Sequence, residues 1–203
     1  MTTAQLRVYE EIMAGPRERL VGPLRAAMHR PELADRWQKL GALLRFDTTV
    51  SARLSELAIL ATARRWNSQV EWYVHALEAQ RAGLPVGVIE AIQVAEAPEF
   101  DSAVDAAVYD FTVELQCTGQ VSSTIYSNVL DTLGTVGIVE LTAIVGYYTM
   151  VAMTLNAHEI PMPDGIAEPL RPVGGAASGE RRFDGLTALP KAKLVEPVET
   201  PQP

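Results

Sequence analysis

Apolar residues recur every three or four positions along most of the chain, which is the spacing of one face of an α-helix. The segment 31–46 shows this clearly, because Leu33, Trp37, Leu40 and Leu44 fall close to one face of a helix. No run alternates between apolar and polar residues for long enough to predict a β-strand. The sequence therefore predicts an all-α protein.

Proline, glycine and capping residues divide this pattern into separate helices. Pro31 and Pro85 suit the first turn of a helix, and Gly83 suits a helix end. Pro23 indicates a break or a second start, and Asp101 suits an N-cap. We expect helices over the ranges 5–14, 17–30, 31–46, 52–66, 67–83, 85–97, 101–119, 122–134 and 136–156.

The composition changes after Asn156. Residues 161–203 contain eight of the 13 prolines and the run "GGAASG". Prolines remove helical hydrogen bonds, and few apolar side chains remain there to pack. We predict one helical domain over 1–160 and an extended or disordered tail over 161–203, with a tail lying along a neighbouring subunit as the alternative.

Charge and cysteine content narrow the classes of partner and compartment. Seventeen basic and 25 acidic residues give a net charge of -8, which disfavours nucleic acid and anionic membranes as partners. The single cysteine, Cys117, excludes an intrachain disulfide and favours a reducing compartment. We expect Cys117 to be a small buried apolar residue. The first fifteen residues lack a signal-peptide pattern, so we expect a cytoplasmic protein.

One segment, 136–155, is apolar for about the length of a membrane span. Glu140 lies inside it, and a lone carboxylate in a bilayer is costly. No basic cluster flanks the segment. We therefore expect a helix buried at the centre of the domain or between subunits, with a membrane span as the alternative.

Three polar residues fall near one stripe of the helix expected at 67–83. Ser68, Glu71 and His75 are each about one turn apart. Two antiparallel helices joined at 66–67 would bring Glu56 towards this stripe. A carboxylate fixes the tautomer of an imidazole beside it, and such a pair can exchange protons near neutral pH.

Simpler interpretations exist for the same residues. Ser68 and Glu71 have the spacing of a capping box, in which both side chains only bind backbone N–H groups. Arg64 can clamp a substrate carboxylate or can be a solvated charge at a helix C-terminus. Trp72 can line a pocket or belong to the core. One histidine with two carboxylates is a weak metal-ligand set, so we expect no metal.

The central part of the chain resembles a known family. In "LSELAILATARRWNSQVEWYVHALEAQRAGL", a glutamate is followed after eleven residues by Ser-x-x-Glu-x-x-x-His. Over 29–156 the chain is similar to the carboxymuconolactone decarboxylase and alkylhydroperoxidase-D-like superfamily, in which Cys-x-x-Cys-x-x-x-His follows the glutamate. Glu56 and His75 match that motif, and Ser68 and Glu71 stand at the two cysteine positions.

The resemblance implies a helical bundle of the alkylhydroperoxidase-D-like type and a homo-oligomer, commonly a trimer or hexamer. It does not carry over the thiol chemistry, because serine and glutamate cannot form a disulfide. The pattern "EWYVH" is similar to the decarboxylase-like branch, which lacks the redox cysteines. That branch implies a cofactorless lyase or related acid–base enzyme acting on a small carboxylated or lactone substrate.

These inferences give each residue a role. His75 would exchange the proton at carbon, and Glu71 would orient its ring. Glu56 would be a general base or the partner of an arginine. Arg64 would bind the substrate carboxylate, and Ser68 and Trp72 would line its pocket. The alternatives are a peroxidase, which the missing cysteine pair disfavours, and a non-enzymatic oligomeric binding protein.

Overall fold

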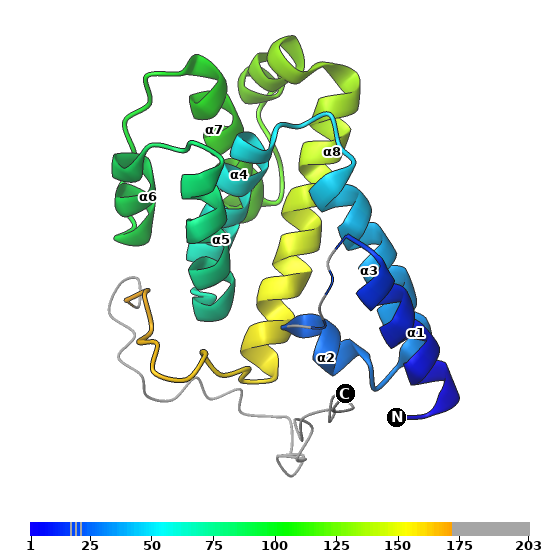
Figure 1. Ribbon diagram of the computed structural model, residues 1–203. Coiled ribbons are helices and arrows are strands. Elements are labelled where there is room, and N and C mark those ends of the chain that lie inside the picture. The colour runs from blue at the N-terminus through cyan, green and yellow to red at the C-terminus, as the bar shows by residue number, and fades with distance from the viewer. Residues whose placement is uncertain (17, 19, 21, 172–203) are drawn as a thin grey trace, which may run out of the picture.

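The computed structural model describes residues 1–16, 18, 20 and 22–171. Within these residues the chain forms helices and no strand, so the all-α prediction is confirmed (Figure 1). The helices are α1 (Thr3–Ala14), α2 (Pro23–Ala27), α3 (Pro31–Phe46), α4 (Ala52–Arg65), α5 (Gln69–Arg81), α6 (Val86–Gln93), α7 (Ala103–Thr118) and α8 (Ser123–Ala157).

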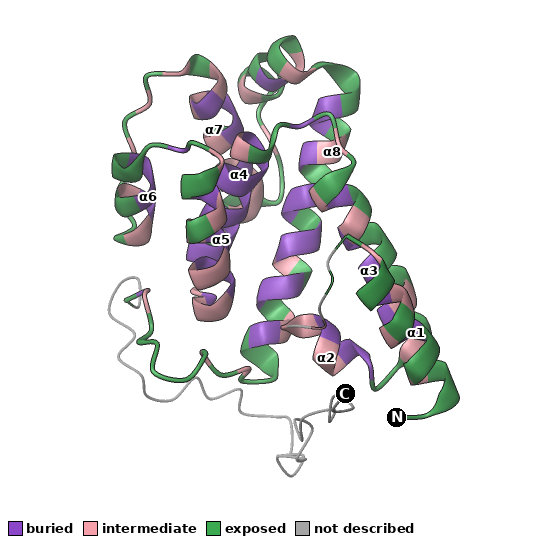
Figure 2. Ribbon diagram, viewed as in Figure 1, coloured by how far each residue is buried: buried purple, intermediate pink, exposed green. Residues whose placement is uncertain are grey.

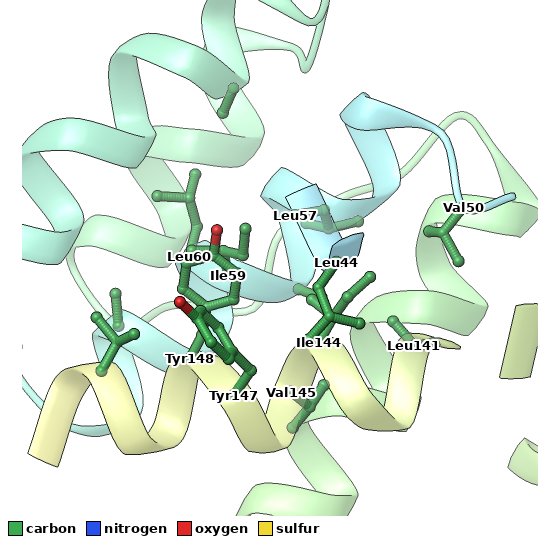
Figure 3. Packing of buried hydrophobic residues seen from close by; sticks show 14 of the residues in the cluster. Leu44, Val50, Leu57, Ile59, Leu60, Leu141, Ile144, Val145, Tyr147 and Tyr148 are labelled. Atoms are coloured by element: carbon green, nitrogen blue, oxygen red, sulfur yellow. The ribbon is translucent and has the colours of Figure 1, made fainter. Parts of the chain in front are cut away.

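Helix α4 is the centre of the bundle. Every residue from 54 to 64 is buried, and α4 packs against α5, α7 and α8 (Figure 2). Figure 3 shows Leu57 and Leu60 of α4 in one cluster with Ile144 and Tyr148 of α8. The sequence explains this position in part, because residues 57–63 are small or apolar at nearly every position and need neighbours on every face of the helix.

Helix α8 contains a break at Gly134, which has φ 68° and ψ 179°. A positive φ is strained for residues with a side chain, so glycine allows the turn between two helical segments. The break lies where the sequence predicted a boundary between helices 122–134 and 136–156. By length and composition α8 could cross a membrane, and a third of its most apolar window is buried by the rest of the protein. The core residues in Figure 3 show that α8 also serves as a core helix.

Two predicted helices are shorter in the structure. The pattern at 17–30 yields a helix only at Pro23–Ala27, because Pro23 lacks the N–H that would continue an earlier helix. Residues 17, 19 and 21 lie outside the described residues. The helix expected at 85–97 ends at Gln93. Ser102, not Asp101, caps α7 by accepting the Asp105 N–H.

The chain from 160 to 171 has no helix but is held against the bundle, and we call it the C-terminal strap (Figure 1, orange). Gln69 binds both the N–H and the carbonyl of Leu170, at 2.8 and 2.9 Å. Arg64 donates to the carbonyl of Arg171. This part of the predicted tail is therefore tied to the bundle by hydrogen bonds near residue 170, although most of its residues are exposed, and 172–203 lie outside the described residues.

The prediction for Cys117 is wrong, because this residue is exposed near the end of α7. The exposure of a side chain depends on that of its helix turn, and the last turn of α7 faces solvent. His29 and His158, which lack partners at helical spacing in the sequence, are also exposed.

Candidate active site

The joint between α4 and α5 folds the two helices into a hairpin. Asn67 adopts a positive φ of 49°, a conformation that asparagine tolerates better than most residues. The Ser68 N–H then donates to the carbonyl of Ala63 at 2.9 Å. Trp66 is held by a hydrogen bond from its indole N–H to Gln116 of α7. The hairpin brings the middle of α4 beside the middle of α5.

Glu56 and His75 meet across this hairpin. The Glu56 carboxylate lies 2.7 Å from Nδ1 of His75, and both side chains are buried. The sequence predicted that the hairpin would bring Glu56 to this stripe, and this juxtaposition is observed. The edge of one ring meets the face of the other between His75 and Tyr148, with centroids 4.9 Å apart. These contacts fix the ring and leave Nε2 as the nitrogen that can serve a bound molecule.

A cavity of about 810 Å³ lies next to this pair. Its wall includes His75 and Glu71 of α5 and Tyr147 and Tyr148 of α8. Residues of α2, the end of α3 and the first part of the C-terminal strap complete the lining. The imidazole is only 5 % exposed, yet it borders this cavity. It is therefore not fully enclosed by packed apolar side chains.

Glu71 is the most unusual side chain of the site. It is 2 % exposed, and neither carboxylate oxygen has a hydrogen-bond partner among the described residues. Burial raises the pKa of Glu71 well above its usual value, and the nearby Ser68 hydroxyl lowers that pKa by less. A carboxyl group in this setting favours its protonated form, which can donate a hydrogen bond to a ligand.

Neither the capping box, which was the simpler interpretation of Glu71, nor its predicted role of orienting His75 is found among the described residues. No capping box forms, because the Ser68 N–H is already bound to Ala63 and the Ser68 hydroxyl makes no capping hydrogen bond. Glu71 does not orient His75 either, since the hydrogen bond to the ring comes from Glu56. Glu56 is accordingly the partner of an imidazole and not of an arginine.

Three other predicted site residues do not line the cavity. Arg64 is buried and donates to the Arg171 carbonyl; its Nε and Nη1 have no partner among the described residues, and burial lowers its pKa. Ser68 is fully buried at the start of α5. Trp72 is 2 % exposed and belongs to the core cluster. The cavity lining therefore does not support the substrate contacts predicted for Arg64, Ser68 and Trp72.

Sequence reasoning missed the polar residues that other helices contribute. Arg25 of α2, Arg45 of α3, and Tyr147 and Tyr148 of α8 all line the cavity. The tyrosine pair was a signal, because two hydroxyl groups inside an apolar helix need polar surroundings when they are buried. Arg25 and Arg45 gave no comparable signal in the sequence, since their positions at the cavity depend on how α2 and α3 lie relative to the α4–α5 hairpin.

The described residues contain no group of three or more His, Cys, Asp or Glu side chains arranged to hold a metal ion. Searches against protein-family models and curated proteins find no match to this chain.

Proposed function

We propose that the protein is a cofactorless acid–base enzyme of the carboxymuconolactone decarboxylase-like type, acting on a carboxylated or lactone substrate. One observation carries this proposal: His75, held by Glu56, borders a cavity whose lining also includes Glu71. Glu56 and His75 are the two residues that match the family motif, and the hydrogen bond between them supports a shared chemical role.

The chemistry assigns a separate task to each of the three groups. Glu56 accepts the Nδ1–H of His75, so Nε2 takes a proton from a substrate carbon or, once protonated, returns it. Glu71 donates a hydrogen bond to the carbonyl oxygen on which negative charge develops. In a decarboxylation, the carbon–carboxylate bond breaks, its electrons form the enolate, carbon dioxide leaves and His75 protonates the carbon.

Proton exchange at carbon tests the proposal without knowledge of the net reaction. The full chain would be incubated in D₂O with a set of lactones and keto or unsaturated acids, and NMR would follow deuterium incorporation and carbon dioxide release. The His75→Gln variant should react about 10²–10⁴-fold more slowly. His158→Gln is the matched control, because His158 is exposed and does not line the cavity. Equal rates for His75→Gln and wild type would refute the proposal.

A thiol peroxidase is the first alternative within the same family resemblance. Its reaction needs a thiolate in the site, and Cys117 is exposed and does not line the cavity. A peroxide-consumption assay on wild type and Cys117→Ser would separate the two activities. A non-enzymatic binding protein is the second alternative, and it predicts ligand binding without deuterium incorporation.

We also propose that the protein is a homo-oligomer and that it works in the cytoplasm. An exposed stripe on α8 supports the first proposal. Its members recur at alternating spacings of three and four residues, as in the contact face of paired helices. The stripe consists of Val136, Val139, Ala143, Gly146, Met150 and Met153. Small residues at its centre let a second helix approach closely, and apart from the adjacent backbone of α8 no described atom lies within 4 Å of the position of a Cβ at Gly146.

A further inference from the structure

The cavity is larger and more apolar than a small lactone requires. Its volume of about 810 Å³ lies near the upper end of the range of about 300–1,000 Å³ for pockets that enclose drug-sized ligands. Much of the wall is aliphatic. These residues are Leu24, Val70, Val74, Val151, Leu155 and Ile160. Burying apolar surface is worth about 25 cal/mol per Å², so the wall selects a ligand with a substantial apolar part.

Two guanidinium groups border the same space. Arg25 comes from α2 and Arg45 from the last turn of α3. Among the described residues neither guanidinium group forms a hydrogen bond or ion pair, and that of Arg45 only lies over the ring of Phe46 at 5.5 Å. Arg53 and Arg81, by contrast, each pair with a carboxylate. In a chain with net charge -8, two unpaired cations at one cavity are available to an external anion.

The acidic side chains of the lining do not neutralise these cations. Glu71 is enclosed and has no hydrogen-bond partner, and Asp164 is an exposed residue of the C-terminal strap. Neither forms an ion pair with an arginine in the described structure. A ligand carboxylate is therefore the group that would complete the hydrogen bonding of the two guanidinium groups.

We infer that the cavity binds an amphipathic organic anion, with its apolar part against α5 and α8 and its carboxylate on Arg25 and Arg45. This inference deepens the proposed function and rests on it for the orientation of the ligand, whose reacting carbon would face His75. It moves carboxylate recognition from Arg64 to α2 and α3. It also replaces a small lactone by a longer, largely apolar carboxylic acid as the substrate class.

Isothermal titration calorimetry on the full chain tests this inference directly. The probes are hexanoate, octanoate, decanoate and dodecanoate, with the primary alcohol of matching length as the uncharged counterpart of each. Affinity should rise with chain length, and each carboxylate should bind more tightly than its alcohol. Replacing both arginines, as Arg25→Gln with Arg45→Gln, should weaken carboxylate binding about ten- to a hundred-fold and leave alcohol binding unchanged.

Two further variants keep the result interpretable. Arg65→Gln is the matched control, because Arg65 is exposed and outside the lining, and it should change nothing. Val74→Trp fills the apolar part and should weaken the carboxylates and alcohols alike. The inference is overturned if no probe binds, if alcohols bind as tightly as carboxylates, or if the double variant binds carboxylates like the wild type.

The same measurements separate this inference from the proposed function. If the probes bind in an arginine-dependent way but no substrate shows proton exchange, the inference holds and the proposed enzymatic function is refuted. If proton exchange requires His75 but neither Arg25 nor Arg45, the proposed enzymatic function holds and the inference is refuted.

Discussion

The carboxylate of Glu56 lies 2.7 Å from the imidazole of His75, although nineteen positions separate the two residues. The contact joins two helices and not two turns of one helix. The residue four positions before His75, Glu71, belongs to the cavity lining, but its carboxyl oxygens are buried and have no hydrogen-bond partner among the described residues. The two glutamates thus have different surroundings, because Glu56 holds the ring whereas Glu71 is enclosed without a hydrogen-bond partner.

Replacing Glu56 should impair catalysis more than it impairs folding. Glu56→Gln keeps the size of the side chain but removes the negative charge that holds the His75 ring, so we expect turnover to fall about 10²-fold or more. ¹⁵N NMR of the ring should show a changed tautomer balance. Asp105→Asn, which breaks the buried pair with Arg53, is the matched control. It should lower stability while leaving the His75 spectrum and the turnover unchanged.

The raised pKa of Glu71 predicts how stability depends on pH. Because the folded state holds this proton more tightly than the unfolded state, the unfolded state binds fewer protons once the pH exceeds about 4.3. The free energy of unfolding should then fall as the pH rises towards the folded-state pKa, by at most about 1.4 kcal/mol per pH unit. Urea denaturation of Glu71→Gln should lack this decline.

The comparison for Glu71 needs an exposed glutamate. Glu90→Gln on α6 serves, because Glu90 is solvent-exposed. The stability of this variant should follow the wild type across the pH range. A difference between wild type and Glu71→Gln that stays constant from pH 5 to pH 8, or that reverses, would contradict a protonated Glu71.

Gln69 should control the order of the C-terminal strap. It accepts from the Leu170 N–H and donates to the Leu170 carbonyl, so Gln69→Ala removes both contacts. Each hydrogen bond contributes roughly 0.5–1.5 kcal/mol, and we expect the Leu170 amide to exchange with D₂O about ten-fold faster or more. Gln80→Ala, an exposed position of the same helix, should not alter this amide. Unchanged exchange in Gln69→Ala would show that other contacts hold the strap.

The exposed stripe of α8 should govern oligomeric state. Val139→Glu combined with Met150→Glu places two charges on this face, and burying them between subunits would be costly. Light scattering coupled to size-exclusion chromatography should therefore show a smaller species than the wild type. Leu77→Glu, which charges an exposed leucine of α5, should leave the mass unchanged. A monomeric wild-type protein would rule out the homo-oligomer.

Helix positions followed from local sequence, and so did the hairpin that pairs Glu56 with His75. Apolar spacing and the Trp66–Asn67 joint were enough, because both act over short distances along the chain. The role of Glu71 did not follow. A capping box and a buried carboxyl group without a partner are compatible with the same spacing, and only the hydrogen bond from the Ser68 N–H to the Ala63 carbonyl distinguishes them.

The cavity itself was beyond the reach of local patterns. Its arginines come from α2 and α3, which the sequence places far from the motif on α4 and α5. Arg64 lies beside the motif in sequence, yet its guanidinium binds the Arg171 carbonyl because the C-terminal strap crosses the end of α4. Proximity in sequence was therefore a poor guide to which cation meets a ligand.

The C-terminal strap has a practical consequence for shortening the protein. Residues 161–164 supply part of the cavity lining, and residues 169–171 are anchored by Arg64, Gln69 and Gln93. A version cut after the last turn of α8, where the helical pattern of the sequence ends, would lose part of the cavity wall together with the segment that Arg64, Gln69 and Gln93 anchor. Crystallisation trials and ligand screens should use chains that extend at least through Arg171.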